Sequence, residues 1–287
     1  MKIQVNPPTD ETKSLLWGYT TWSETSSYNC IITRKFIPSN FLSLHILLTG
    51  KVKFEGQTIY PGVPFLIFPS DKPIFLGFKV MTKGISLFFV PMALSLEFNR
   101  QETGIFPPCN LRTRFLLDRL KNELHSDSNI KIIPKYVHDL LYELFLMFNK
   151  PYLINSHRYN YSKILYAGNF SDKARFYFCE RHFRRKFKLF FGLTPVKYFR
   201  ILRLQQLLRL KKEKVLSISE LVALCGYYDN AHLTHEFKYF TGLSPREYFK
   251  ATDHYMDLFL PYVHFGAPNE PDLFLSEAKN RRLEYSG

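Results

Sequence analysis

The sequence predicts an α+β protein, with a β-rich part toward the N-terminus and an all-α part toward the C-terminus. In the first third of the 287-residue chain, short runs of Phe, Ile, Leu and Val alternate with turn residues, which is typical of strands. Farther along, a thirteen-residue phrase occurs twice, as FKLFFGLTPVKYF from Phe187 and as FKYFTGLSPREYF from Phe237. An internal repeat of this kind indicates that one supersecondary unit is used twice.

Residues 15–92 predict a series of strands. The runs FLSLHILLTG, KVKFEGQTIY, VPFLIFPS and ISLFFVP are separated by turn pairs such as Glu55-Gly56 and Pro61-Gly62. Several short strands at regular spacing favour a sandwich or a barrel. Apolar periodicity then predicts two helices, over residues 111–125 and 134–148.

Polar residues and prolines between residues 150 and 162 suggest a domain boundary. We therefore expect a β-rich domain with two trailing helices over residues 1–150. A helical domain over residues 160–250 follows, and residues 251–287 form a C-terminal tail for which the sequence suggests no function.

Both copies of the repeated phrase predict the end of one helix and the start of another. Gly192 and Gly242 lie where a helix needs a left-handed residue after its last turn. The pairs Thr194-Pro195 and Ser244-Pro245 follow, and a hydroxyl N-cap before proline is a helix start signal. In the second copy Glu247 completes a capping box with Ser244.

The helix upstream of each glycine is amphipathic. One face is apolar at helical spacing and is expected to be buried. The opposite face is polar or basic, as is required of a helix that lies in the major groove of DNA. The expected buried residues are Phe183, Phe187 and Phe190 in the first copy, and Leu233, Phe237 and Phe240 in the second. The outward residues are Arg181, Arg184, Arg185 and Lys188 in the first copy, and Ala231, Thr234, His235 and Lys238 in the second.

The segment SISELVALCGYYDN, from Ser217 to Asn230, precedes the second copy. It predicts a capped apolar helix, a turn at Gly226 and a new helix capped by Asp229. Helix, glycine turn and polar-faced helix together form the helix-turn-helix pattern. The first copy lacks a clear counterpart of the leading helix, so that helix is either degenerate or out of register.

Because of these motifs, the stretch from about Lys163 to Lys250 resembles the DNA-binding domain of AraC/XylS-type transcriptional regulators. The segments LVALCGYYDNAHLTHEFKYFTGLSPREYF and RHFRRKFKLFFGLTPVKYFRILRLQ carry the resemblance. It implies two helix-turn-helix units joined by a long helix, here from Pro195 to about Lys212. It also implies a cytoplasmic, sequence-specific regulator that binds double-stranded DNA and acts with RNA polymerase, most often as an activator.

The resemblance also implies which residues bind DNA. In the first unit, the base-reading positions are Arg181, Arg184 and Arg185, with Lys188 as a phosphate contact. In the second unit, they are Asn230, Ala231, His232, Thr234 and His235, with Lys238 as the phosphate contact. Other interpretations stay open, because Asn230 can serve the helix cap and His232 can be a packing residue. His235 stands where many members of the family carry arginine.

Charge supports a polyanionic partner. The chain has a formal net charge of +14. Between residues 151 and 250 there are 19 Lys and Arg against 7 Asp and Glu, whereas the rest of the chain is nearly balanced, with 20 against 18. A basic excess confined to the segment with the repeats favours nucleic acid as the partner of that segment.

Several functional classes receive no support from the sequence. The four cysteines are scattered without metal-ligand spacing, which suits reduced thiols in a cytoplasm. No apolar stretch approaches the length of a membrane helix, and no catalytic constellation, metal site or cofactor motif stands out. His45 is the single histidine in the strand region, and a strand residue is a simpler interpretation of it than a metal ligand.

The N-terminal part resembles the family more loosely. Many AraC-type regulators place a cupin-like β-domain before the DNA-binding part, where it binds an effector, forms dimers or does both. By this analogy in domain order, we expect a sensor or dimerisation module, with a small-molecule effector and a homodimer as the implied partners. Two other hypotheses remain, namely an enzyme fused to a DNA-targeting domain and a nonspecific nucleic-acid binder.

Overall fold

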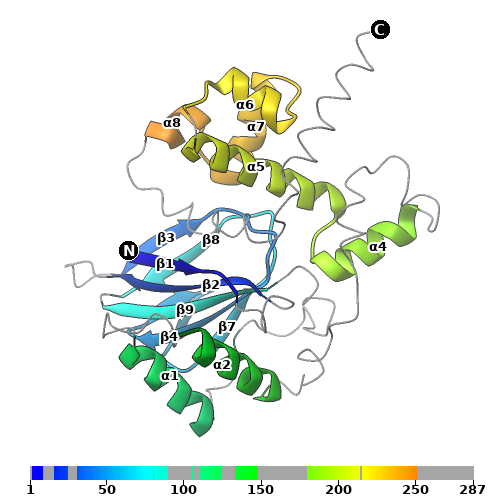
Figure 1. Cartoon of the computed structure of the whole chain (residues 1–287). Coiled ribbons are helices and arrows are strands. Elements are labelled where there is room, and N and C mark those ends of the chain that lie inside the picture. The colour runs from blue at the N-terminus through cyan, green and yellow to red at the C-terminus, as the bar shows by residue number, and fades with distance from the viewer. Residues whose placement is uncertain are drawn as a thin grey trace. The chain divides into compact units, whose positions relative to one another are not determined.

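The structure is a computed structural model. It describes residues 2–8, 16–24, 31–79, 81–89, 105, 110–123, 133–147, 180–213 and 215–250. These residues divide into two compact units, one made mostly from the first 160 residues and the other mostly from the remainder. We call them the β-rich unit and the helical unit. Their order along the chain confirms the expected α+β fold class (Figure 1). The boundary expected between residues 150 and 162 lies outside the described residues.

The β-rich unit is built on two antiparallel sheets. One sheet has the strand order β1-β2-β9-β4-β7, and the other has the order β3-β8-β5-β6. The register joins distant segments, because β9 pairs with β2 on one side and with β4 on the other. The strands are β1 (Lys2–Asn6), β2 (Leu16–Glu24), β3 (Ile32–Phe36), β4 (Ser43–Thr49), β5 (Val52–Phe54), β6 (Gln57–Ile59), β7 (Pro64–Ile67), β8 (Ile74–Phe78) and β9 (Thr82–Phe89).

Two helices pack on the sheet that contains β4 and β9. They are α1 (Leu111–Glu123) and α2 (Ile133–Met147), close to their predicted bounds, and Figure 1 shows them along one face of that sheet. The Asn110 side chain caps α1 by accepting a hydrogen bond from the backbone N–H of Thr113 at 2.8 Å. Alternate residues of the strands face the helices, as the period of two requires. The shared core includes Leu44, Ile46, Ile85, Leu87, Leu117, Leu120, Leu140 and Leu141.

The other face of the same sheet packs on the second sheet through aromatic rings. Trp22 and Phe78 meet edge to face with 5.4 Å between ring centroids, and Phe54 lies 5.4 Å from Phe65. Trp22, Phe65 and Phe88 are buried. Because these rings fill the space between the sheets, the aromatic residues of this region form core contacts.

A buried hydrogen-bond network lies among these rings. The Nε2 atom of His45 is 2.8 Å from the Ser43 hydroxyl, and its Nδ1 atom is 2.7 Å from the Ser86 hydroxyl. Trp22 donates its indole N–H to Ser86 at 2.9 Å. Burial lowers the pKa of His45 from 6.5 to about 3, so the imidazole is neutral at physiological pH. Both ring nitrogens of His45 have hydrogen-bond partners, which gives this residue a structural role.

Gly84 makes room for Trp22, and replacing it with alanine should destabilise the β-rich unit. A Cβ atom at Gly84 would lie 2.3 Å from Cζ2 of the Trp22 ring. Since overpacking a dense core costs about 1–3 kcal/mol, we expect Gly84→Ala to lower the free energy of unfolding by that amount. Denaturant titration followed by tryptophan fluorescence measures the change. The double variant Trp22→Phe/Gly84→Ala should lose less stability than the sum of the single changes, and strict additivity would contradict this account.

The helical unit consists of five described helices. They are α4 (Glu180–Phe191), α5 (Pro195–Glu213), α6 (Ile218–Cys225), α7 (Asn230–Thr241) and α8 (Pro245–Lys250). Figure 1 shows the long helix α5 running between α4 and the group formed by α6, α7 and α8. The core of the helical unit includes Phe187, Phe191, Tyr198, Leu204, Leu221, Leu233, Phe237 and Tyr248.

The structure also differs from the expectations at some positions. Strand β1 lies before residue 15, where we predicted no strand, and its five residues pair with β2. Phe191 is buried in α4, whereas the sequence pattern favoured Phe183 and Phe190, whose side chains lie outside the described set. The leading helix of the first helix-turn-helix unit and the tail from residue 251 also fall outside the described residues.

Candidate DNA-binding site

The predicted helix-turn-helix pattern is present in α6 and α7. Ser217 caps α6, and a full capping box joins it to Glu220. Gly226 ends α6 in the left-handed conformation with φ of 69°. Asp229 then caps α7 by accepting a hydrogen bond from the backbone N–H of His232 at 2.7 Å. Each signal that the sequence offered for this unit is confirmed.

The two copies of the repeated phrase have the same structure. Helices α4 and α7 each contain 12 residues and start at equivalent positions. Each helix ends at a left-handed glycine, with φ of 73° at Gly192 and 75° at Gly242. Phe187 meets Tyr198 edge to face at 5.4 Å, and Phe237 meets Tyr248 at 5.1 Å. The repeat in sequence is therefore a repeat in packing.

The residues with predicted DNA contacts lie on the outer faces of these helices. Arg181, Arg184, Arg185 and Lys188 are exposed on α4, at the spacing i, i+3, i+4, i+7. On α7, the exposed residues are Asn230, Ala231, Thr234, His235 and Lys238. Four of the positions correspond one to one between the helices. We call these two surfaces the α4 stripe and the α7 stripe.

Two of the α7 residues with predicted DNA contacts, Thr234 and His232, also have partners within the protein. Thr234 donates its hydroxyl hydrogen to the backbone carbonyl of Asn230 at 2.7 Å, and its oxygen can still accept a hydrogen bond. His232 is half-buried, packs edge to face on Tyr227 at 5.4 Å, and accepts a hydrogen bond from the backbone N–H of Tyr228 at 3.3 Å. These contacts give His232 a packing function at the start of α7.

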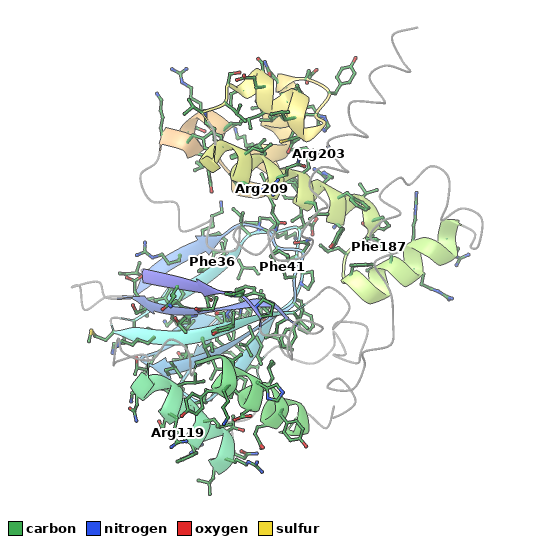
Figure 2. All side chains as sticks on the ribbon, viewed as in Figure 1. Phe36, Phe41, Arg119, Phe187, Arg203 and Arg209 are labelled. Atoms are coloured by element: carbon green, nitrogen blue, oxygen red, sulfur yellow. The ribbon has the colours of Figure 1, made fainter. Side chains whose placement is uncertain are left out.

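Sequence reasoning missed a buried carboxylate in the second unit. Glu236 of α7 is 5% exposed and accepts a hydrogen bond from Nε of Arg200 on α5 at 2.6 Å. Nη1 of Arg203 lies 3.7 Å from the same carboxylate. Figure 2 labels Arg203 on α5. The sequence did contain a signal for this ion pair. Glu236 lies within the apolar stripe of Leu233, Phe237 and Phe240, and a charged residue on a buried face needs a partner of opposite charge.

Other chemistry has no visible site among the described residues. No group of three or more His, Cys, Asp or Glu side chains in that part of the chain is placed to hold a metal ion. Burial raises the pKa of the Cys225 thiol to about 12, so the thiolate that a nucleophile requires is scarce there. No helix within the described ranges has both the length and the apolar character needed to cross a membrane.

The fold and the exposed stripes define a class, that of DNA-binding helix-turn-helix proteins. Residues 173–251 match the family described as "Helix-turn-helix domain". This segment has an AraC-type helix-turn-helix domain, a kind of domain found in DNA-binding transcription regulators.

Three solved structures are similar to the chain to different degrees. ToxT from Vibrio cholerae, in its P21 crystal form, matches with a TM-score of 0.50 and 12% identity, covering 88% of this chain and all of ToxT. ToxT bound to an unsaturated fatty acid matches with a TM-score of 0.42 and 13% identity, covering 90% of this chain and 95% of that one. The AraC-like transcriptional activator CuxR reaches 0.26 at 11% identity, covering 82% and 80%.

The first of these similarities shows a shared fold. No curated protein sequence matches the chain. The chain shares with ToxT the order of a β-rich unit before a helical one. The residues that contact DNA in this chain are inferred from its own structure.

Proposed function

We propose that this protein binds promoter DNA in a sequence-specific manner by placing α4 and α7 in successive major-groove segments. The main support is the correspondence of the two stripes, because the same four positions are exposed on two helices with equivalent buried faces. Helix α5 has 19 residues. At a rise of about 1.5 Å per residue it spans roughly 28 Å, comparable to the ~34 Å that separate successive turns of DNA.

The two stripes differ in chemistry, which implies different contributions to binding. The α4 stripe carries three arginines, whose planar guanidinium groups can donate two hydrogen bonds to O6 and N7 of guanine. The α7 stripe offers a hydroxyl, an imidazole and the Ala231 methyl group, which suits contact with a thymine methyl. Lys188 and Lys238 occupy equivalent positions and are the proposed phosphate contacts. Cationic contacts of this kind should make affinity fall steeply with salt.

Arg185→Ala is expected to weaken binding to the cognate element by about 5- to 150-fold, as the loss of a bidentate base contact costs about 1–3 kcal/mol. Binding to random DNA should change much less, because the variant loses only one charge of many. The cognate element comes from selection in a random DNA pool, and fluorescence anisotropy then measures both affinities at one salt concentration.

Arg114→Ala is the matched control for this experiment, because Arg114 is exposed on α1 of the β-rich unit and its removal changes the net charge equally. Equal losses on cognate and random DNA would count against base reading by Arg185. A selection that yields no preferred sequence would favour the nonspecific nucleic-acid binder instead.

For the β-rich unit we propose a sensor or dimerisation module, in a cytoplasmic regulator that is not an enzyme and that activates transcription with RNA polymerase. The support is the position of a separate β-rich unit before the DNA-binding part. We place the domain limits at residues 1–150 and 160–250. Mass spectrometry of the native protein purified from its host would detect a copurified effector, and sedimentation would reveal a homodimer.

A further inference from the structure

The contacts of Glu236 join α7 to the long helix α5. Its carboxylate is buried, and two arginines of α5 lie beside it, Arg200 with Nε at 2.6 Å and Arg203 with Nη1 at 3.7 Å. The imidazole of His232 faces the same carboxylate, with 3.6 Å between Nε2 and Oε1. A buried carboxylate that lost its partners would be strongly destabilising, so this site holds α5 and α7 together.

The two arginines also bind aromatic rings at opposite ends of α7. Arg203 lies over Tyr227, just before α7, with 5.2 Å to the ring centroid. Arg200 lies over Tyr239 at 4.9 Å, near the last turn of α7. Since Arg200 and Arg203 are one helical turn apart on α5, α7 is held near its beginning and near its end. We call this set of contacts the α7 clamp.

The residue at the centre of the clamp differs between the two copies of the repeat. The position that corresponds to Glu236 in the first copy of the repeat is Lys186, fifty residues earlier. A lysine cannot accept hydrogen bonds from arginine. The repeat therefore preserves the aromatic packing in both units, whereas the position of the anionic anchor is occupied by a lysine in the first copy.

We propose that Glu236 is a positioning residue that sets the orientation of α7 on α5 and thereby the spacing at which the α7 stripe meets DNA. This inference rests on the proposed function, in which α4 and α7 read successive segments. Glu236 itself is buried and does not contact a base. It acts through Arg200, which donates its Nε–H to Oε1 at 2.6 Å, and through the charge of Arg203, whose Nη1 lies 3.7 Å from Oε2.

The test measures tolerance to spacing in the full-length protein. One additional base pair between the two segments moves the second by about 3.4 Å and turns it by about 34°. Wild-type protein should lose at least about tenfold in affinity on the DNA with the insertion, a loss of about 1.4 kcal/mol. Glu236→Gln should bind the uninterrupted element about tenfold more weakly than wild type, and its own penalty for the insertion should fall to threefold or less.

Asp118→Asn is the matched control. It makes the same change in net charge at an exposed position on α1 of the β-rich unit, and it should keep the wild-type penalty for the insertion. Loss of stability alone would lower affinity on both DNAs equally, so the ratio between them separates positioning from folding. If Glu236→Gln does not fold, Arg203→Gln leaves the shorter contact of Arg200 in place and should also reduce the penalty.

The spacing experiment gives different results when the positioning role of Glu236 is wrong and when sequence-specific DNA binding is wrong. A Glu236→Gln protein that retains the full penalty, beside a wild type that has it, overturns the positioning role and leaves sequence-specific reading intact. A wild type that shows no sequence preference overturns both proposals.

Discussion

Phe237→Ala is expected to lower the free energy of unfolding of the helical unit by about 3–5 kcal/mol, as is usual when a buried phenylalanine is truncated. The Phe237 ring is fully buried, meets Tyr248 edge to face at 5.1 Å and lies 5.6 Å from Phe249. Its removal leaves a cavity where α7 and α8 meet. A loss of this size is a large part of the stability of a small domain, so DNA binding should decline with folding as temperature rises.

Far-ultraviolet circular dichroism in a denaturant series measures this change, since it reports mainly the helices. Both tryptophans, Trp17 and Trp22, lie in the β-rich part of the sequence, so their fluorescence should not move with the helical transition. Tyr228→Ala is the matched control, because its ring is 87% exposed and a surface truncation changes stability by only about 0.5 kcal/mol. A Phe237→Ala protein as stable as Tyr228→Ala would refute the packing described for α7.

The β-rich unit is expected to lose about 2 kcal/mol of stability between neutral pH and pH 5 because of His45 alone. The pKa of His45 is about 3 in the fold, against 6.5 as its ordinary value. Between these values the unfolded chain binds a proton that the folded chain excludes. The contribution of neutral His45 is therefore complete above pH 6.5 and is lost progressively as pH falls toward 3.

Comparison with His45→Gln isolates this effect, because glutamine keeps polar atoms near Ser43 and Ser86 but does not titrate. Tryptophan fluorescence in denaturant at pH 7 and pH 5 should show that the difference in unfolding free energy between the two pH values is about 2 kcal/mol smaller in the variant. Nuclear magnetic resonance gives a direct check. An imidazole of His45 that titrates near pH 6.5 in the folded protein would contradict its burial.

Local signals accounted for the helical unit and for the stripes. Caps and turns act over a few residues, so Ser217, Asp229 and Gly242 identified the helix limits from sequence alone. The i, i+3, i+4, i+7 spacing separated the α4 stripe from the buried face. The fold class and the helix-turn-helix pattern were accessible for the same reason. The DNA contacts of individual stripe residues stay predictions.

Contacts between residues far apart in the sequence could not be predicted from local sequence patterns. Strand β1 has only five residues, and pairing with β2 stabilises it. The hydrogen-bond partners of His45 lie on β4 and β9, and Ser86 is forty-one residues away. Glu236 meets Arg200 across thirty-six residues. No periodic pattern in a single segment encodes such pairs, because each depends on where two separate elements pack.

The amino-acid order by itself determined the helix-turn-helix unit, its repetition and the outward basic stripe, since these follow from hydrogen bonds and periodicities within about one helical turn. Only the tertiary structure decided that Glu236 is clamped by two arginines and that His45 is neutral inside a sheet sandwich. Burial of a charged or titratable group is a property of the assembled core, where the surrounding elements replace water and supply the partners.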